Sequence, residues 1–119
     1  MIRKSKSSWS CSAFYVQKQV ELEKGTPRLV INYKLHNDAL RWIIYLIPNK
    51  KDLIHRLVKT KGFSKFDMKL GFWKILIVEK DRYKTTFMVL FGHYEWNVMP
   101  FGLKNAPSEF QNIMNEIFN

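Results

Sequence analysis

The sequence lacks most features of secreted, membrane-spanning or cysteine-rich proteins. Cys11 is the only cysteine in 119 residues, so the chain can form neither an internal disulfide nor a cysteine-built metal site. The longest apolar runs, 42–47 and 75–78, have the length of a strand and not of a membrane span. The first ten residues are basic and rich in serine, and no apolar segment follows them as in a signal peptide. We therefore expect an intracellular protein, in the cytoplasm, the nucleus or both, with no membrane partner.

Acidic residues are also scarce. The chain has 10 Asp and Glu against 20 Lys and Arg, which gives a net charge of +10. Residues 1–60 contain 12 basic and 4 acidic side chains, a net +8, whereas residues 61–119 contain 8 and 6, a net +2. A basic half with interspersed aromatics suits a nucleic-acid partner. On charge alone, it equally suits a surface that only maintains solubility.

The remaining composition is that of a folded domain. Hydrophobic residues make up 46% of the chain and aromatic residues 15%, which excludes a disordered tail. A length of 119 residues corresponds to one domain with a sizeable core.

The first half of the chain predicts a hairpin followed by a helix. We expect residues 1–12 to be loose, because they are basic and serine-rich. Runs 13–18 and 28–33 are rich in strand-forming residues and flank a polar turn that contains Gly25. An extended run then ends at Pro48, and Asn49 can cap a helix. One face of that helix would carry Leu53, Ile54, Leu57 and Val58.

The second half predicts strands with a helix at the end. A short buried strand, 63–66, should end on Asp67, and further strands are expected at 73–78, 83–90 and 94–99, with a hairpin turn at Gly92-His93. A last helix should begin near Pro107. Its apolar face would consist of Phe110, Ile113, Met114, Ile117 and Phe118. The pattern predicts an α+β fold of mostly antiparallel strands with packed helices.

Two stretches are much more specific than this layout. Residues 63–73, Phe-Ser-Lys-Phe-Asp-Met-Lys-Leu-Gly-Phe-Trp, resemble the first catalytic motif of reverse transcriptases. Residues 92–111, with Met-Pro-Phe-Gly-Leu-Lys-Asn-Ala-Pro at 99–107, resemble the motif that surrounds the template and the incoming nucleotide. The residues of both motifs are similar to those of the caulimovirus family of plant pararetroviruses and related retroelements, most closely its badnavirus branch.

The resemblance implies the fingers and an incomplete palm of a right-hand polymerase. The fingers would span roughly 13–60 and the palm part roughly 61–119. The implied activity is RNA-directed DNA polymerisation, with a dNTP and an RNA or DNA template-primer as partners, alongside the rest of a polyprotein that includes a ribonuclease H region. The family's Tyr-x-Asp-Asp motif does not occur in these residues. We therefore expect the chain alone to be inactive.

Asp67 resembles the first of the family's three catalytic aspartates. Nucleotidyl transfer uses two divalent ions that stabilise the attacking and leaving oxygens, and Mg²⁺ prefers oxygen ligands. The resemblance implies that Asp67 binds Mg²⁺, with the Met68 carbonyl as a further ligand. An isolated aspartate at a strand end more often caps the following turn.

Three further residues match positions that bind the nucleotide. Phe72 stands where the family places an aromatic steric gate against a 2′-hydroxyl, although a Phe beside a Trp is commonly a core residue. Arg28 matches the fingers arginine that binds the triphosphate, a task suited to a guanidinium fork. Lys18 is the candidate for the accompanying lysine, and a solvated surface lysine fits its position equally well.

The second motif supplies the remaining candidates. Gly102 permits close approach of the backbone to a ligand, and Phe101 would lie under the nucleotide. Lys104 and Pro107 would lie near the template. Standing alone, this stretch would be interpreted as a Gly/Pro loop before a helix.

Several residues depart from the family pattern. Leu70 replaces a usual Ser, and its bulk should crowd the nucleotide phosphates. His36 replaces a usual Leu; Lys74 replaces Gln; Ile44 and Leu46 replace Arg and Pro.

The sequence leaves three hypotheses for the function of the chain. It is part of a polymerase, a nucleic-acid-binding remnant of an integrated element, or a remnant without function.

Overall fold

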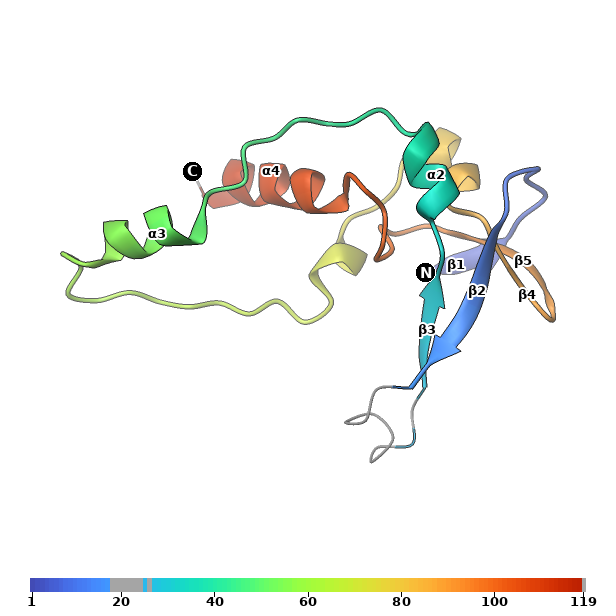
Figure 1. Cartoon of the computed structure of the whole chain (residues 1–119), viewed down its shortest axis with the longest axis horizontal. Coiled ribbons are helices and arrows are strands. Elements are labelled where there is room, and N and C mark those ends of the chain that lie inside the picture. The colour runs from blue at the N-terminus through green and yellow to red at the C-terminus, as the bar shows by residue number, and fades with distance from the viewer. Residues whose placement is uncertain (18–24, 26, 119) are drawn as a thin grey trace.

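In a computed structural model, which describes residues 1–17, 25 and 27–118, the chain forms one twisted sheet with helices beside it (Figure 1). The strands are β1 (Ile2–Lys4), β2 (Cys11–Val16), β3 (Arg28–Ile31), β4 (Phe87–Val89) and β5 (Gly92–Trp96). The α-helices are α2 (Lys34–Ala39), α3 (Lys50–Leu57) and α4 (Ala106–Phe118). Two 3₁₀ segments, η1 (Gly71–Lys74) and η2 (Glu79–Thr85), precede β4. The expected α+β class is confirmed.

The sheet has the order β1-β5-β4-β2-β3 and is antiparallel except for the β2–β4 pair. The predicted hairpin of β2 and β3 is present, with Ala13 opposite Ile31 and Val16 opposite Arg28. Most of its connection lies outside the described residues. The β4–β5 hairpin is also present, but its turn falls at residues 90–91, between Val89 and Gly92, and not at the expected Gly92-His93.

The expectation that residues 1–12 are loose is wrong. Ile2–Lys4 form the edge strand β1, which pairs with β5 so that Ile2 lies opposite Trp96. Side chains reinforce the pairing: Arg3 and Ser5 both donate to the buried carboxylate of Glu95. The strand forms by pairing with β5, whose residues lie 90 to 94 positions later in the sequence, so local composition carries no sign of it.

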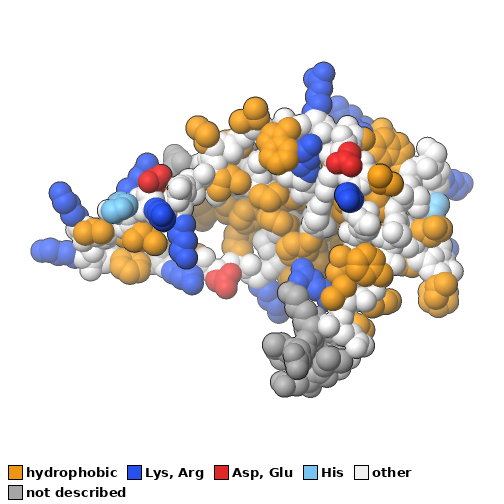
Figure 2. Space-filling model, in the orientation of Figure 1, with side chains coloured by type: hydrophobic (Ala, Val, Ile, Leu, Met, Phe, Trp, Pro, Cys, Tyr) orange, Lys and Arg blue, Asp and Glu red, His pale blue; other side chains and the backbone are white. Residues whose placement is uncertain are grey.

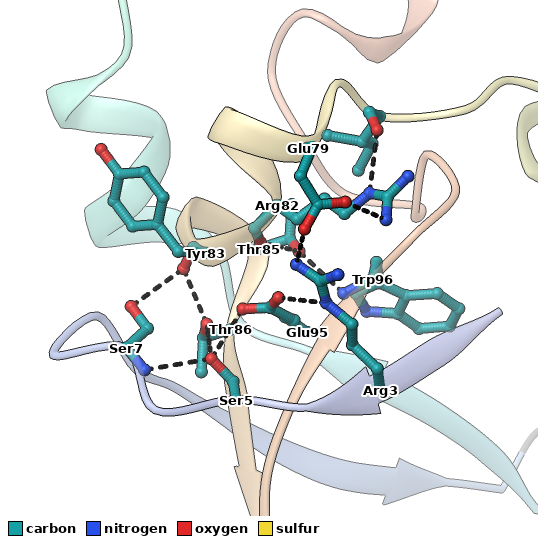
Figure 3. A network of polar contacts seen from close by, with 11 residues as sticks. Arg3, Ser5, Ser7, Glu79, Arg82, Tyr83, Thr85, Thr86, Glu95 and Trp96 are labelled. Atoms are coloured by element: carbon teal, nitrogen blue, oxygen red, sulfur yellow. Dashed lines mark hydrogen bonds and ion pairs between the residues drawn. The ribbon is translucent and has the colours of Figure 1, made fainter.

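A network of polar contacts extends this attachment to η2 (Figure 3). Arg3 bridges Glu95 and Glu79 at 2.6 Å each, and Glu79 in turn bonds Arg82 at 2.6 Å. The pKa of the Arg3 guanidinium is raised, first by the bond to Glu79 and then by the bond to Glu95. The network therefore ties the start of the chain to the segment that precedes β4.

The core lies on one face of the sheet around Cys11, Tyr33 and Phe87. Tyr33 is almost fully buried, and its hydroxyl donates to the Thr85 carbonyl at 2.7 Å. Partly buried hydrophobic residues pack against these three: Ala13, Ile31, Val89, Tyr94, Trp96 and Leu103.

His36 is buried next to this core. Its Nδ1 lies 2.9 Å from Cys11 Sγ, and Trp9 meets its ring edge-on with 4.9 Å between centroids. Burial lowers the pKa of His36 and raises the pKa of the Cys11 thiol. Both groups are therefore held neutral at neutral pH.

The helices at 50–57 and 106–118 agree with the sequence prediction, and α2 was not expected. Asn49 caps α3 as predicted, because its Oδ1 accepts from the Lys51 N–H at 2.9 Å.

No residue of α3 is buried, and its predicted apolar face is uncovered; Leu53, for example, is 43% exposed. Figure 1 shows α3 held away from the sheet by two long irregular segments. Accordingly, the radius of gyration is 17.4 Å, against about 13.5 Å for a compact chain of this length.

The predicted buried strand 63–66 is wrong. The segment is irregular, and Phe63 and Phe66 are 74% and 82% exposed. A strand needs a partner for its backbone groups, and within the described residues no segment pairs with this one.

Two other predicted strands are absent or shorter than expected. The expected strand 73–78 is replaced by η1 and a single bridge between Leu76 and Val98, and the expected strand 83–90 shrinks to β4. Ion pairs three residues apart, Glu79–Arg82 and Asp81–Lys84, favour a helical turn over an extended chain at η2.

Candidate functional site

Two adjoining grooves bring together most of the residues that the sequence singled out. The first, here called the Asp67 groove, has a volume of about 640 Å³ and lies between residues 66–72 and α4. Its walls are largely apolar, and Figure 2 shows apolar side chains gathered over the middle of the molecule. It is lined by Phe66, Asp67, Met68, Leu70, Gly71, Phe72, Phe101, Phe110, Met114 and Phe118.

The second, the Arg28 groove, has a volume of about 510 Å³ and lies beside β3. It is lined by Arg28, Leu29, Val30, Ile31, Leu70, Trp73, Trp96, Pro100, Phe101 and Gly102. Leu70 and Phe101 belong to both grooves, so these two side chains form the wall between them.

Phe101 is the centre of a cluster of rings and one cation. The Arg28 guanidinium carbon lies 5.5 Å from the centroid of the Phe101 ring, a cation–π geometry. The Phe72 centroid lies 5.2 Å and the Trp73 centroid 6.1 Å from that of Phe101. Phe72 also meets Phe110 edge-on, with 5.3 Å between the ring centroids. The ring of Phe72 is therefore held between the 100–103 loop and α4.

The backbone before Phe72 is unusual. Leu70 has φ 55° and ψ 47°, and it is the one non-glycine residue in the described parts of the chain with a positive φ. A left-handed conformation is costly for a residue with a Cβ. Gly71 follows, where a Cβ would lie 3.0 Å from the Phe110 ring. This turn directs residues 70–72 towards α4, and a side chain at position 71 would require the Phe110 ring to shift.

Gly102 also needs to be glycine. Its φ is 95°, and a Cβ there would lie 3.6 Å from the Tyr33 ring. The positive φ is what requires glycine, because a Cβ at this distance would make only an ordinary contact. The turn places Phe101 against Arg28.

Two predicted template residues line neither groove. Lys104 Nζ donates to the carbonyls of Asn37 and Leu40 at 3.2 and 3.4 Å, and it lies 4.8 Å from the centroid of the Trp42 ring. It therefore caps the carboxyl end of α2. Pro107 is exposed in the first turn of α4. Lys18, the third candidate cation, lies outside the described residues.

Asp67 is exposed and borders an apolar groove. It is the only acidic side chain among the residues that line the two grooves. Across the described residues, no group of three or more His, Cys, Asp or Glu could bind a metal ion. One carboxylate with a neighbouring carbonyl does not fit a pair of Mg²⁺ ions, which require several oxygen ligands from the protein.

Trp73 and Phe110 belong to the site but were not recognised as part of it. Trp73 lines the Arg28 groove, and in the described structure its buried indole N–H has no hydrogen-bond partner. Phe110 was assigned to a core stripe of the last helix, and it does lie on that face of α4. Its contact with Phe72, 38 positions earlier, has no signal in the local sequence.

This fold is that of reverse transcriptases. The prototype foamy virus protease-reverse transcriptase superposes with a TM-score of 0.82, 21% identity and 98% of this chain covered, which is 15% of that protein. The foamy viral enzyme solved in complex with an RNA/DNA hybrid gives a TM-score of 0.83 at 22% identity, again over 98% of this chain and 15% of that protein.

Sequence similarity then fixes the family. Residues 6–119 match the model of the reverse transcriptase (RNA-dependent DNA polymerase) family, and the chain belongs to that family. It is 50% identical over 118 residues to the genome polyprotein of Petunia vein clearing virus. It is 46% identical over 118 residues to the enzymatic polyprotein of Cauliflower mosaic virus. These matches confirm the predicted resemblance to caulimoviruses, whereas the badnavirus branch stays a prediction.

The chain spans a small part of each relative. Each match includes 99% of this chain, but only 5% of the Petunia vein clearing virus polyprotein and 17% of the Cauliflower mosaic virus polyprotein. Among the described residues, no helix is long and apolar enough to cross a membrane.

Proposed function

We propose that this chain supplies the nucleotide-binding part of a reverse transcriptase active site, which transfers deoxynucleotides from dNTP to a primer 3′-hydroxyl on an RNA or DNA template. The observation that carries the proposal is convergence. Residues from three separate parts of the chain, each with a nucleotide-related role in the family motifs, line two adjoining grooves: Arg28, Asp67, Met68, Phe72, Phe101 and Gly102.

Each role follows from the chemistry of the side chain. Arg28 presents a planar guanidinium fork to the triphosphate, because its N–H edge matches phosphate oxygens. Phe72 places its ring under the sugar and excludes a 2′-hydroxyl. Gly102, without a Cβ, lets the nucleotide approach the backbone.

Asp67 is proposed as one ligand of the Mg²⁺ pair that reverse transcriptases generally use, with the Met68 carbonyl beside it. The described residues do not complete such a site, so the other ligands would come from elsewhere in a polyprotein. When bound, the ions would stabilise the attacking and leaving oxygens.

The remaining assignments rest on the resemblance alone. Residues 13–60 are proposed as fingers and 61–119 as part of the palm, next to a ribonuclease H region elsewhere in the polyprotein. Lys18 is proposed as a second triphosphate cation, and Lys104 and Pro107 as neighbours of the template. The alternative, a non-catalytic nucleic-acid-binding remnant, is not favoured, because the similarity to viral polyproteins covers 99% of the chain.

A chimaeric polymerase tests the proposal. Residues 1–119 would replace the matching segment of the Cauliflower mosaic virus enzymatic polyprotein, and primer extension with labelled dNTP would be measured. We expect extension, and we expect Asp67→Asn to reduce it by about 100-fold or more. The matched control is Asp81→Asn, an aspartate that lines neither groove. Equal activity of the two variants would remove Asp67 from the reaction.

A further inference from the structure

We propose that Phe101 is a positioning residue that joins Arg28 and Phe72 into one unit, so that triphosphate binding and sugar selection depend on the same ring. The inference rests on the proposed function and goes beyond it. It concerns how two nucleotide-binding side chains are held, and not which ligand they contact.

The first observation is the position of Arg28. Its guanidinium carbon lies 5.5 Å from the Phe101 centroid, and among the described residues Arg28 forms no salt bridge. A guanidinium that stacks on a ring keeps its N–H edge free. Phe101 therefore holds the Arg28 guanidinium over its ring at the edge of the Arg28 groove, and no described carboxylate occupies the donors that phosphate oxygens would need.

The second observation is that the same ring supports Phe72. The two centroids are 5.2 Å apart with the ring planes tilted by 43°, a favourable aromatic pair. Phe101 borders both grooves, so any movement of its ring changes both walls at once. Arg28 and Phe72, which are not neighbours in sequence, are thereby coupled through one side chain.

The third observation supplies a matched control. Phe110 supports Phe72 from α4 at 5.3 Å, but it lines the Asp67 groove only. Loss of the Phe110 ring should therefore disturb Phe72 and leave Arg28 in place.

Kinetics in the chimaeric polymerase separate the two contacts. We expect Phe101→Leu to raise the KM for dNTP about fivefold, which is the effect expected from loss of one cation–π contact. The variant should also lower the preference for dNTP over rNTP. Phe110→Leu should lower that preference and leave KM unchanged. Phe101→Tyr, which keeps the ring, should have the KM and the preference of the unsubstituted enzyme.

In the double variant Arg28→Ala/Phe101→Leu, KM should match that of Arg28→Ala, because the contact is already lost. Multiplication of the two single effects would overturn the proposal.

A measurement on the chain itself does not require activity. In the NMR spectrum of residues 1–119, the Arg28 side-chain protons should be shifted upfield by the Phe101 ring and should return towards their ordinary positions in Phe101→Leu. Unshifted Arg28 protons in the unsubstituted chain would refute the proposed contact. Shifted protons together with an inactive chimaera would instead show that the contact exists and the proposed function fails.

Discussion

Arg3 Nε lies 2.6 Å from Glu95 Oε1, which joins a residue near the start of the chain to a carboxylate 92 positions later. Glu95 is only 6% exposed, and its other oxygen accepts from Ser5 Oγ at 2.7 Å. Burial of a carboxylate is unfavourable unless it is paired and hydrogen-bonded, and here both oxygens have donors. The pair thus adds to the backbone hydrogen bonds that hold β1 against β5.

Glu95→Gln should therefore lower the urea midpoint of unfolding. The buried position keeps its size but loses the charge that Arg3 and Ser5 bind. Glu79→Gln is the matched control, since Glu79 also pairs with Arg3 but its side chain is 66% exposed and screened by water. We expect a clearly smaller change for Glu79→Gln. Equal changes in the two midpoints would mean that burial of Glu95 is not what gives the pair its importance.

His36 should make stability depend on pH. Burial lowers its pKa below the ordinary 6.5, so between these values the unfolded chain binds a proton that the folded chain does not. Stability is therefore complete above about pH 6.5 and falls as the pH decreases below it. Cys11 and Tyr33, the titratable groups in contact with the imidazole, keep raised pKa values and stay neutral in this range.

The variant His36→Leu, which removes the titratable ring and keeps an apolar side chain, isolates this effect. Urea midpoints measured from pH 8 to pH 5 should fall for the unsubstituted chain and fall less steeply for the variant. Parallel curves would assign the pH dependence to other groups.

The sequence predicts elements whose signals are local. The last helix follows from its apolar spacing, α3 from Asn49, and the first hairpin from two runs of strand-forming residues around a turn with Gly25. Local signals fail where a strand depends on a distant partner. Ile2 was judged loose although Trp96 pairs with it, and Phe66 was judged buried although no described segment covers it.

The candidate site shows the same division. Motif resemblance picked out six of the residues that line the grooves, because residue types at fixed spacing are visible in one sequence: Arg28, Asp67, Met68, Phe72, Phe101 and Gly102. It could not show that Phe101 lies between Arg28 and Phe72, or that Phe110 supports Phe72. These contacts arise from the packing of residues that are 29 to 73 positions apart in the sequence.

Leu70→Gly should stabilise the isolated chain. Leu70 has a left-handed backbone that glycine adopts without steric cost, so its replacement removes strain of about 1 kcal/mol, offset in part by greater freedom of the unfolded chain. The change should appear as a higher urea midpoint. Gly71→Ala is the opposite test at the next position, because its Cβ would lie 3.0 Å from the Phe110 ring. We expect a lower midpoint for Gly71→Ala. If Leu70→Gly also lowered the midpoint, the packing of the Leu70 side chain would outweigh its backbone strain.

The isolated chain should not extend a primer on any template. Asp67 is the only carboxylate that lines the two grooves, and a single carboxylate does not hold a pair of Mg²⁺ ions. Incorporation of labelled dNTP should equal that of the Asp67→Asn variant. Incorporation above that control would show that the chain assembles a working metal site from its own residues.

The isolated chain should still bind duplex nucleic acid weakly, through the exposed basic segment around α3. Residues 50–65 carry six basic side chains and one acidic one, a net +5, and every one of them is exposed: Lys50, Lys51, Arg56, Lys59, Lys61 and Lys65, with Asp52. Phosphate contacts release counterions, so log affinity should fall linearly with log salt by roughly 0.9 per phosphate neutralised.

The double variant Lys59→Gln/Lys61→Gln tests this location. If both lysines contact phosphates, the salt slope should become shallower by about 1.8. Lys74→Gln/Lys80→Gln removes the same charge from exposed positions outside the segment, and its slope should be unchanged. Titrations of a labelled duplex at several salt concentrations give both slopes. Because the two variants have the same net charge, equal slopes would mean that binding follows the overall charge of the chain and that the α3 segment has no special part in it.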